Sequence, residues 1–252
     1  MGGIKSALAA AVSRLAGPLG LTVVPTWRLR DLEYQGVPTF RFGGAEYPHL
    51  LHHHNCGRLP ESATERTVEL PLADRWLAHA PADRVVEVGA VTPYYWPGRV
   101  RRVADPADPH PQVTDRVGVE HLDLTGAAVL CVSTLEHIGS GEYGLPPDPP
   151  ALARAVEKLC REAAAFLVTV PVGYSPHADA VFLAPPPPGV TAGYLVRPGR
   201  RRGWVEVPAP AQARLPYNPP AATAADPRGA NAVVVWERGG FLAAPPPPAG
   251  GA

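Results

Sequence analysis

The residues best suited to chemistry begin at the end of a short apolar run, residues 85–89 (VVEVG), which contains Glu87 and closes on Gly89. In doubly wound folds the first strand leads into a glycine turn at the carboxyl edge of the sheet, where ligands bind. A Cβ in that turn would block the close approach of a nucleotide. Asp105 ends the next short strand, sixteen residues after Gly89. Its carboxylate could accept hydrogen bonds from both hydroxyls of a ribose.

A second group of polar residues surrounds the apolar run 127–132. Asp123 precedes this run, and we expect its carboxylate beside an adenine. Thr134, Glu136 and His137 follow the run, within residues 133–139 (STLEHIG), and are expected at the same edge as the glycine turn. His137 is the best candidate for a general base, because an unperturbed imidazole has a pKa of about 6.5. Glu136 is the alternative base, and a purely structural role stays open for both.

Alternating strands and helices are predicted to position these residues. Short apolar runs indicate buried strands at residues 84–89, 100–104, 127–132, 166–170 and 232–236. Helical periodicity predicts helices at residues 64–80, with Thr64 as the cap, and at 151–165. On the first helix Arg66 and Glu69 are spaced to pair. Strands that alternate with helices favour a parallel sheet covered on both faces, and residues 193–207 read as a hairpin.

The order of these motifs resembles the class I S-adenosylmethionine-dependent methyltransferases. The motifs are VVEVG at 85–89, Asp105, Asp123, STLEHIG at 133–139 and VTVP at 168–171. The chain is more specifically similar to a bacterial subfamily found among cell-surface polysaccharide genes. That subfamily also has segments like ERTVELP at 65–71, PVGY at 171–174 and NAVVV at 231–235. The resemblance spans roughly residues 40–238, and STLEHIG is its most specific part.

The resemblance implies an α/β class, a Rossmann-like methyltransferase fold. Its sheet would be mostly parallel and seven-stranded, with an antiparallel last strand. We expect an N-terminal helix and loop extension over residues 1–60, the methyltransferase domain over 61–240, and a disordered proline- and glycine-rich tail over 241–252.

In function, the resemblance implies transfer of a methyl group from S-adenosylmethionine to a small-molecule or carbohydrate-like acceptor. Glu87 and Gly89 would shape the methionine and ribose end of the cofactor pocket. Asp105 would bind the ribose, and Asp123 would lie near the adenine. The segment from Thr134 to His137 would line the floor between cofactor and substrate.

One departure from the family pattern affects the cofactor turn. Methyltransferases usually carry Glu-x-Gly-x-Gly there, but the second glycine position is Val91 in this chain, and Pro93 follows. A β-branched residue disfavours a positive φ, and proline stiffens the turn. Either the turn takes another path, or cofactor binding is weakened or lost. The alternative function is therefore a catalytically inactive protein of this fold that serves as a binding or assembly partner in a biosynthetic pathway. A nucleotide-sugar or NAD enzyme is disfavoured, because no GxGxxG lies near the first strand.

The amino-acid composition excludes some classes of binding partner. The 23 basic and 23 acidic residues balance, so no electrostatic footprint for nucleic acid is expected. No apolar stretch reaches the length of about 20 residues that spans a bilayer. The three cysteines include no CxxC pair, which disfavours disulfides and zinc and favours the cytoplasm. Cys131 reads as a core residue.

Three other clusters have competing interpretations. Neighbouring histidines in the run His52–His54 point to opposite sides of an extended chain, so a loop over the sheet edge is favoured over a metal site. Arg197 and the arginines at 200–202 read as a solvated turn rather than a phosphate site. The aromatic run 94–96 reads as core or lid rather than a stacking platform.

Overall fold

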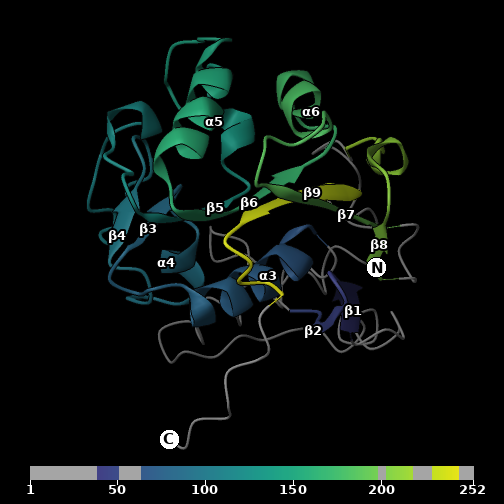
Figure 1. Ribbon diagram of the computed structural model, residues 1–252. Coiled ribbons are helices and arrows are strands. Elements are labelled where there is room, and N and C mark those ends of the chain that lie inside the picture. Colours follow the sequence, from purple (N-terminus) through teal and green to yellow (C-terminus); the bar gives the residue numbers. More distant parts are fainter. Residues whose placement is uncertain (1–38, 51–63, 198–202, 218–228, 244–252) are drawn as a thin grey trace, which may run out of the picture.

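A seven-stranded sheet dominates the computed structural model, which describes residues 39–50, 64–197, 203–217 and 229–243 (Figure 1). The strands follow the order β4-β3-β5-β6-β9-β7-β8. Their bounds are Val85–Val88 for β3, Arg102–Ala104 for β4, Ala128–Val132 for β5, Ala165–Pro171 for β6, Thr191–Val196 for β7, Val205–Val207 for β8 and Ala232–Arg238 for β9.

The sheet has a parallel part and an antiparallel part. β4, β3, β5 and β6 are parallel neighbours, whereas the last strand, β9, lies antiparallel between β6 and β7. β7 and β8 form an antiparallel hairpin. The predicted α/β class, seven mostly parallel strands, the hairpin and the antiparallel last strand are thus confirmed. This architecture is compatible with a Rossmann-like fold.

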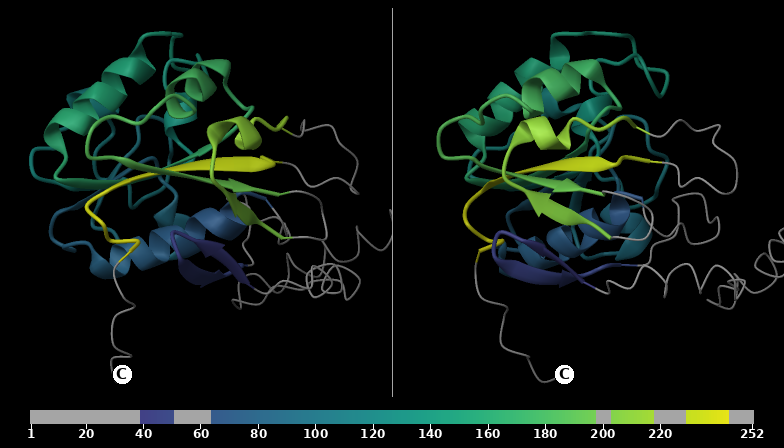
Figure 2. Two further views of the ribbon diagram at one scale, coloured as in Figure 1. Left: turned by 45° about the vertical axis from the view of Figure 1, so that its right-hand side comes forward. Right: turned by 90° about the vertical axis from the view of Figure 1, so that its right-hand side faces the viewer.

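Helices cover both faces of the sheet (Figures 1 and 2). One face carries α5 (Ala151–Glu162) and α6 (Pro176–Phe182). The other carries α3 (Arg66–His79), α4 (Thr92–Tyr95) and a hairpin of β1 (Thr39–Phe42) and β2 (Ala45–Pro48). Short 3₁₀ turns lie at Val119–His121, Leu135–His137 and Pro210–Ala213.

The central strands are mostly apolar because both of their faces are covered, and their polar residues are Glu87 in β3 and Thr169 in β6. Every residue of β3, β5 and β6 is buried. Successive side chains alternate between two cores, so Val129 and Cys131 pack toward α5 while Ala128 and Leu130 pack toward α3. Cys131 is a core residue, as predicted.

Helix α3 contains Pro71, which has no backbone N–H to donate to the carbonyl of Thr67. The N–H of Leu50, just after β2, donates to that carbonyl instead, at 3.1 Å. The helix predicted at 64–80 is confirmed, but the predicted cap is wrong. Glu65 occupies the N-cap with helical backbone angles, and its side chain makes no capping hydrogen bond.

The β1-β2 hairpin falls within the predicted N-terminal extension, yet it packs closely on the sheet. A Cβ added to Gly193 of β7 would lie 2.4 Å from the ring of Phe42. The N–H of Gly43 donates to the carboxylate of Glu206 on β8. Leu242, in the predicted tail, is also buried, and its carbonyl accepts a hydrogen bond from Arg75 at 3.0 Å. Residues 1–38, 51–60 and 244–252 lie outside the described part of the chain.

Candidate functional site

The carboxyl ends of β3, β5 and β6 bring three segments to one edge of the sheet. They are the turn at Gly89, residues 133–137 and residues 172–174, which follow the three strands in that order. Ligands of open α/β sheets bind at this edge. Of the predicted site residues, all but Asp123 lie at this edge.

The turn after β3 takes a path that needs no second glycine. Gly89 has a φ of +88°, but Val91 has a φ of −104° and a ψ of −53°, which a β-branched residue adopts readily. The Val91 side chain joins the apolar core on the α3 side of the sheet. Pro93 lies in the first turn of α4, where proline is tolerated. The departure from the family pattern therefore changes the path of the turn without introducing strain at Val91.

Glu87 holds this turn in place. One oxygen of its fully buried carboxyl accepts the N–H groups of Val91 at 2.9 Å and Thr92 at 2.7 Å. The other oxygen accepts the hydroxyl of Thr92. Burial raises the pKa of Glu87 to about 7, although these hydrogen bonds act in the opposite direction. Glu87 therefore stabilises the turn through hydrogen bonds to Val91 and Thr92, and both of its carboxyl oxygens are used in them.

Contact with Thr134 is a second reason for glycine at position 89, one that the sequence did not indicate. A Cβ at this position would lie 2.0 Å from Oγ1 of Thr134, so the Thr134 side chain occupies the space that was expected to accommodate a nucleotide. Thr134 in turn donates its hydroxyl to the carbonyl of Val132 at 3.1 Å. The two predicted cofactor residues therefore contact each other directly.

Gly89→Ala is expected to lower the free energy of unfolding by about 2–4 kcal/mol. Of this, about 1–2 kcal/mol comes from the left-handed backbone and the rest from the clash with Thr134. Gly126→Ala is the matched control, because Gly126 has a φ of +72° but nothing within 4 Å of an added Cβ. Gly126→Ala should lower the free energy of unfolding only by the part that comes from the left-handed backbone. Equal losses in urea unfolding would show that Thr134 yields to the added methyl group.

Asp105 lies beside the Gly89 turn, where it was predicted. Its Oδ2 accepts the N–H of Ala90 at 3.2 Å, and its Oδ1 accepts the N–H groups of Ala107 and Asp108 at 2.8 Å each. A carboxylate has about four acceptor positions, so about one remains for a ligand hydroxyl. Asp105 can accept one ribose hydroxyl rather than the predicted two.

Asp123 lies at the opposite edge of the sheet, so its predicted place beside an adenine is wrong. It precedes β5, and it lines a surface depression together with Val85 and Ala127, at the amino ends of β3 and β5. Its carboxylate is exposed and accepts the N–H of Thr125 at 3.0 Å, which lowers its pKa.

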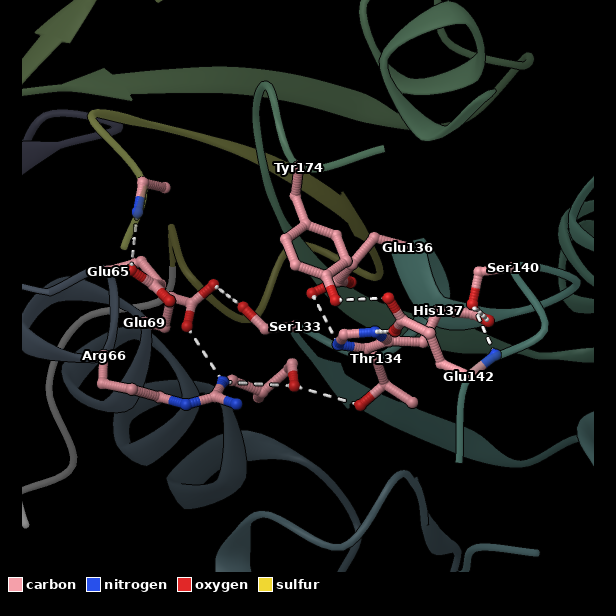
Figure 3. A network of polar contacts seen from close by, with 12 residues as sticks. Glu65, Arg66, Glu69, Ser133, Thr134, Glu136, His137, Ser140, Glu142 and Tyr174 are labelled. Carbon is pink, nitrogen blue, oxygen red and sulfur yellow. Dashed lines mark hydrogen bonds and ion pairs between the residues drawn. The ribbon is translucent and has the colours of Figure 1, made fainter. Parts of the chain in front are cut away.

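His137 is held by two residues that follow it along the chain (Figure 3). Its Nδ1 lies 2.5 Å from Oε2 of Glu142, and the hydroxyl of Tyr174 donates to Oε1 of the same carboxylate at 2.7 Å. Burial lowers the pKa of His137, and the Glu142 carboxylate partly offsets that effect. With Nδ1–H donated to Glu142, the lone pair of the neutral ring is on Nε2. This is the arrangement of a general base with an orienting carboxylate.

Glu136 lies beneath His137 and is only 2% exposed. Its Oε1 is 3.7 Å from Nε2 of His137, and its Oε2 has no hydrogen-bond partner within the described residues. Burial raises the pKa of Glu136 well above its ordinary value, and the nearby Glu69 carboxylate acts in the same direction. Glu136 is thus a buried carboxyl with one oxygen to which no described residue donates.

A buried ion pair joins the start of α3 to the end of β5. The Arg66 guanidinium contacts Oε2 of Glu69 at 3.0 Å, which confirms the predicted pair, and it donates to the carbonyl of Val132 at 3.2 Å. The other oxygen of Glu69 accepts the hydroxyl of Ser133 at 2.5 Å. Ser133 has a φ of +42°, uncommon for a residue with a side chain. These bonds fix the start of the segment that carries Thr134, Glu136 and His137.

The other sequence candidates have structural roles where they can be described. Tyr94 donates its hydroxyl to Asp108, and Tyr95 and Trp96 pack against the α3-side core, as the core interpretation predicts. Arg197 is not part of a solvated turn, because it is 5% exposed and donates to Asn231 at 2.9 Å. The run His52–His54 and the arginines at 200–202 lie outside the described residues. Within the described ranges no group of three metal-ligating side chains occurs, and no helix is long and apolar enough to cross a bilayer.

Sequence reasoning missed Glu142 and gave no role to the Tyr174 hydroxyl. The only signal for Glu142 was a carboxylate five residues after a candidate base, in a loop with glycines at 139, 141 and 144.

No protein-family model matches the chain, and no curated protein or solved structure matches it either. The proposed function therefore rests on the geometry of the site and on the motifs that it contains.

Proposed function

We propose that the protein is an S-adenosylmethionine-dependent methyltransferase that acts on a small-molecule or carbohydrate-like acceptor. The observation that carries the proposal is the position of His137. It is oriented by Glu142 at the same sheet edge as the Gly89 turn and Asp105. This edge is where a doubly wound sheet binds a nucleoside.

The residues at this edge fit the cofactor in part. Asp105 keeps acceptor capacity for one ribose hydroxyl, and Glu87 holds the turn that would face the nucleoside. When bound, S-adenosylmethionine supplies a methyl group already activated on a sulfonium. The protein then has to align the acceptor and remove its proton. His137 would take that proton at Nε2, and the Glu142 carboxylate would stabilise the resulting imidazolium.

A second candidate function has its own support. Thr134 occupies the space over Gly89, and three acceptor positions of Asp105 are used by backbone N–H groups. Both features favour a catalytically inactive protein of this fold that binds a partner or metabolite without the cofactor. The two candidates differ in a single measurable property, the affinity for the cofactor or its demethylated product.

Calorimetry with S-adenosylhomocysteine separates the two candidates. If Asp105 holds the ribose, Asp105→Ala should weaken binding by about 1–3 kcal/mol, because one charged hydrogen bond is lost. Asp123→Ala is the matched control and should leave the affinity unchanged, since that carboxylate lies at the other edge of the sheet. No heat and no thermal shift at millimolar ligand would exclude the methyltransferase and leave the binding protein.

A further inference from the structure

Four glutamates lie along a chain of contacts that runs from the start of α3, past Ser133, to the loop after His137. They are Glu65, Glu69, Glu136 and Glu142, called the acidic cluster below, and Figure 3 shows them around Arg66 and His137. Glu65 accepts the N–H of Ala230 at 2.9 Å, and Glu69 is bound by Arg66 and Ser133. In the described part of the chain, Arg66 is the permanent cation that acts on the carboxyls of Glu65 and Glu136. The cluster therefore holds more carboxyl groups than positive charges.

One carboxyl oxygen of Glu136 lacks a hydrogen-bond partner among the described residues, whereas the other lies 3.7 Å from Nε2 of His137. Oε2 of Glu136 is buried without a hydrogen bond from any described residue, a state that costs free energy unless something binds there. The pKa values of Glu65 and Glu136 are raised by burial and by neighbouring carboxylates. An added positive charge would favour the ionised form of both groups.

Tyrosine rings border the same cluster. Tyr174 lies with its ring centroid 4.8 Å from that of His137, and Tyr217 lies 5.2 Å from Tyr174. Tyr143 packs edge-on to His137 at 5.2 Å, is 67% exposed and has a φ of +56°. The pKa of Tyr217 is raised by burial and by Glu65, Glu136 and Glu69, so its ring lies within the field of the acidic cluster. Aromatic faces combined with carboxylates attract organic cations.

We propose that the acidic cluster and these tyrosines form a subsite for an organic ammonium group. A metal ion is a poorer occupant, because no three metal-ligating side chains converge among the described residues. A neutral hydroxyl would satisfy Oε2 of Glu136 but not the excess of carboxylates. If the protein is the proposed methyltransferase, the ammonium compound is its methyl acceptor, an amine or amino sugar, and this part of the inference rests on the proposed function. The subsite itself does not depend on that function.

The test uses the full-length protein without S-adenosylmethionine. Propylammonium chloride is titrated into the labelled protein and followed by two-dimensional NMR, with 1-propanol as the uncharged match and sodium chloride as the ionic-strength control. Propylammonium should bind at least about tenfold more tightly than propanol, with shifts around residues 133–142 and 174. Equal affinities, or no saturable binding by propylammonium, would overturn the subsite.

Two variants locate the site. Glu136→Gln should reduce propylammonium affinity at least about tenfold and leave propanol unaffected, because the amide keeps the shape and removes the charge. Tyr143→Ala alters an exposed ring and should weaken binding several-fold without affecting folding. Glu157→Gln, an exposed carboxylate on α5, is the control and should change nothing. Propylammonium binding that survives both Glu136→Gln and Tyr143→Ala would refute the assignment. If the protein binds propylammonium but not S-adenosylhomocysteine, the methyltransferase proposal fails and the ammonium subsite stands.

Discussion

Replacing His137 with alanine is expected to lower turnover by about 100-fold or more, while the affinity for S-adenosylhomocysteine stays within about twofold. The reason is that Nε2 of His137 is the basic nitrogen that Glu142 leaves available at the sheet edge. Among the described hydrogen bonds, none joins the imidazole to Gly89, Asp105 or Glu87. Its loss should therefore not alter the residues proposed to bind the cofactor. Single-turnover kinetics and calorimetry measure the two quantities separately.

The pH dependence distinguishes a base from a structural histidine. His137 acts in its neutral form, so wild-type turnover should fall as the pH drops through its pKa, which burial places below the ordinary value. The Glu142 carboxylate raises that pKa, so Glu142→Gln should move the acid limb to still lower pH and also reduce the maximal rate. Equal losses of turnover and cofactor affinity in His137→Ala, or an acid limb unmoved in Glu142→Gln, would assign both residues a structural role.

The sheet was predictable because its strands are buried on both faces. Residues 128–132 form a continuous apolar run, and residues 85–88 form one that only Glu87 interrupts; such runs between helices are typical of central parallel strands. The hairpin and the last strand were likewise indicated by turn residues between β-forming segments. Whether β9 pairs beside β6 or at an edge is a matter of long-range pairing, and only the resemblance suggested its direction.

The candidate site was predictable where the residues follow a parallel strand within five positions. Gly89, Asp105, Thr134 and His137 all do so, and all lie at the carboxyl edge. Asp123 was misplaced because it precedes β5, and a residue before a parallel strand lies at the amino edge. The partners of His137 could not be predicted, since Tyr174 is 32 residues from Glu142 and no local pattern links them. Arg197 was assigned to solvent because it lies near a predicted turn, whereas Asn231, 34 residues away, binds it.

Arg66→Met is expected to destabilise the fold by about 3–5 kcal/mol, the largest stability effect among the substitutions considered. Removing the guanidinium leaves the fully buried Glu69 without its ion pair and the Val132 carbonyl without the N–H that Arg66 gives it. It also removes the permanent cation of the acidic cluster, so that buried carboxyls must bind protons instead. Urea unfolding should show a lower midpoint with an unchanged slope, since the surface exposed on unfolding stays the same.

The matched control for Arg66→Met is Arg161→Met on α5, where an exposed arginine lies 3.8 Å from Glu157. Exposed pairs contribute about 0–1 kcal/mol, so this variant should unfold close to the wild type. The double variant Arg66→Met, Glu69→Met should regain much of the loss, because the larger part of the penalty is the stranded charge rather than the missing attraction. If the double variant is instead as unstable as Arg66→Met, the bonds from Arg66 to Val132 and from Glu69 to Ser133 dominate. The ion pair would then serve to fix the Ser133 backbone and, through it, the segment that carries His137.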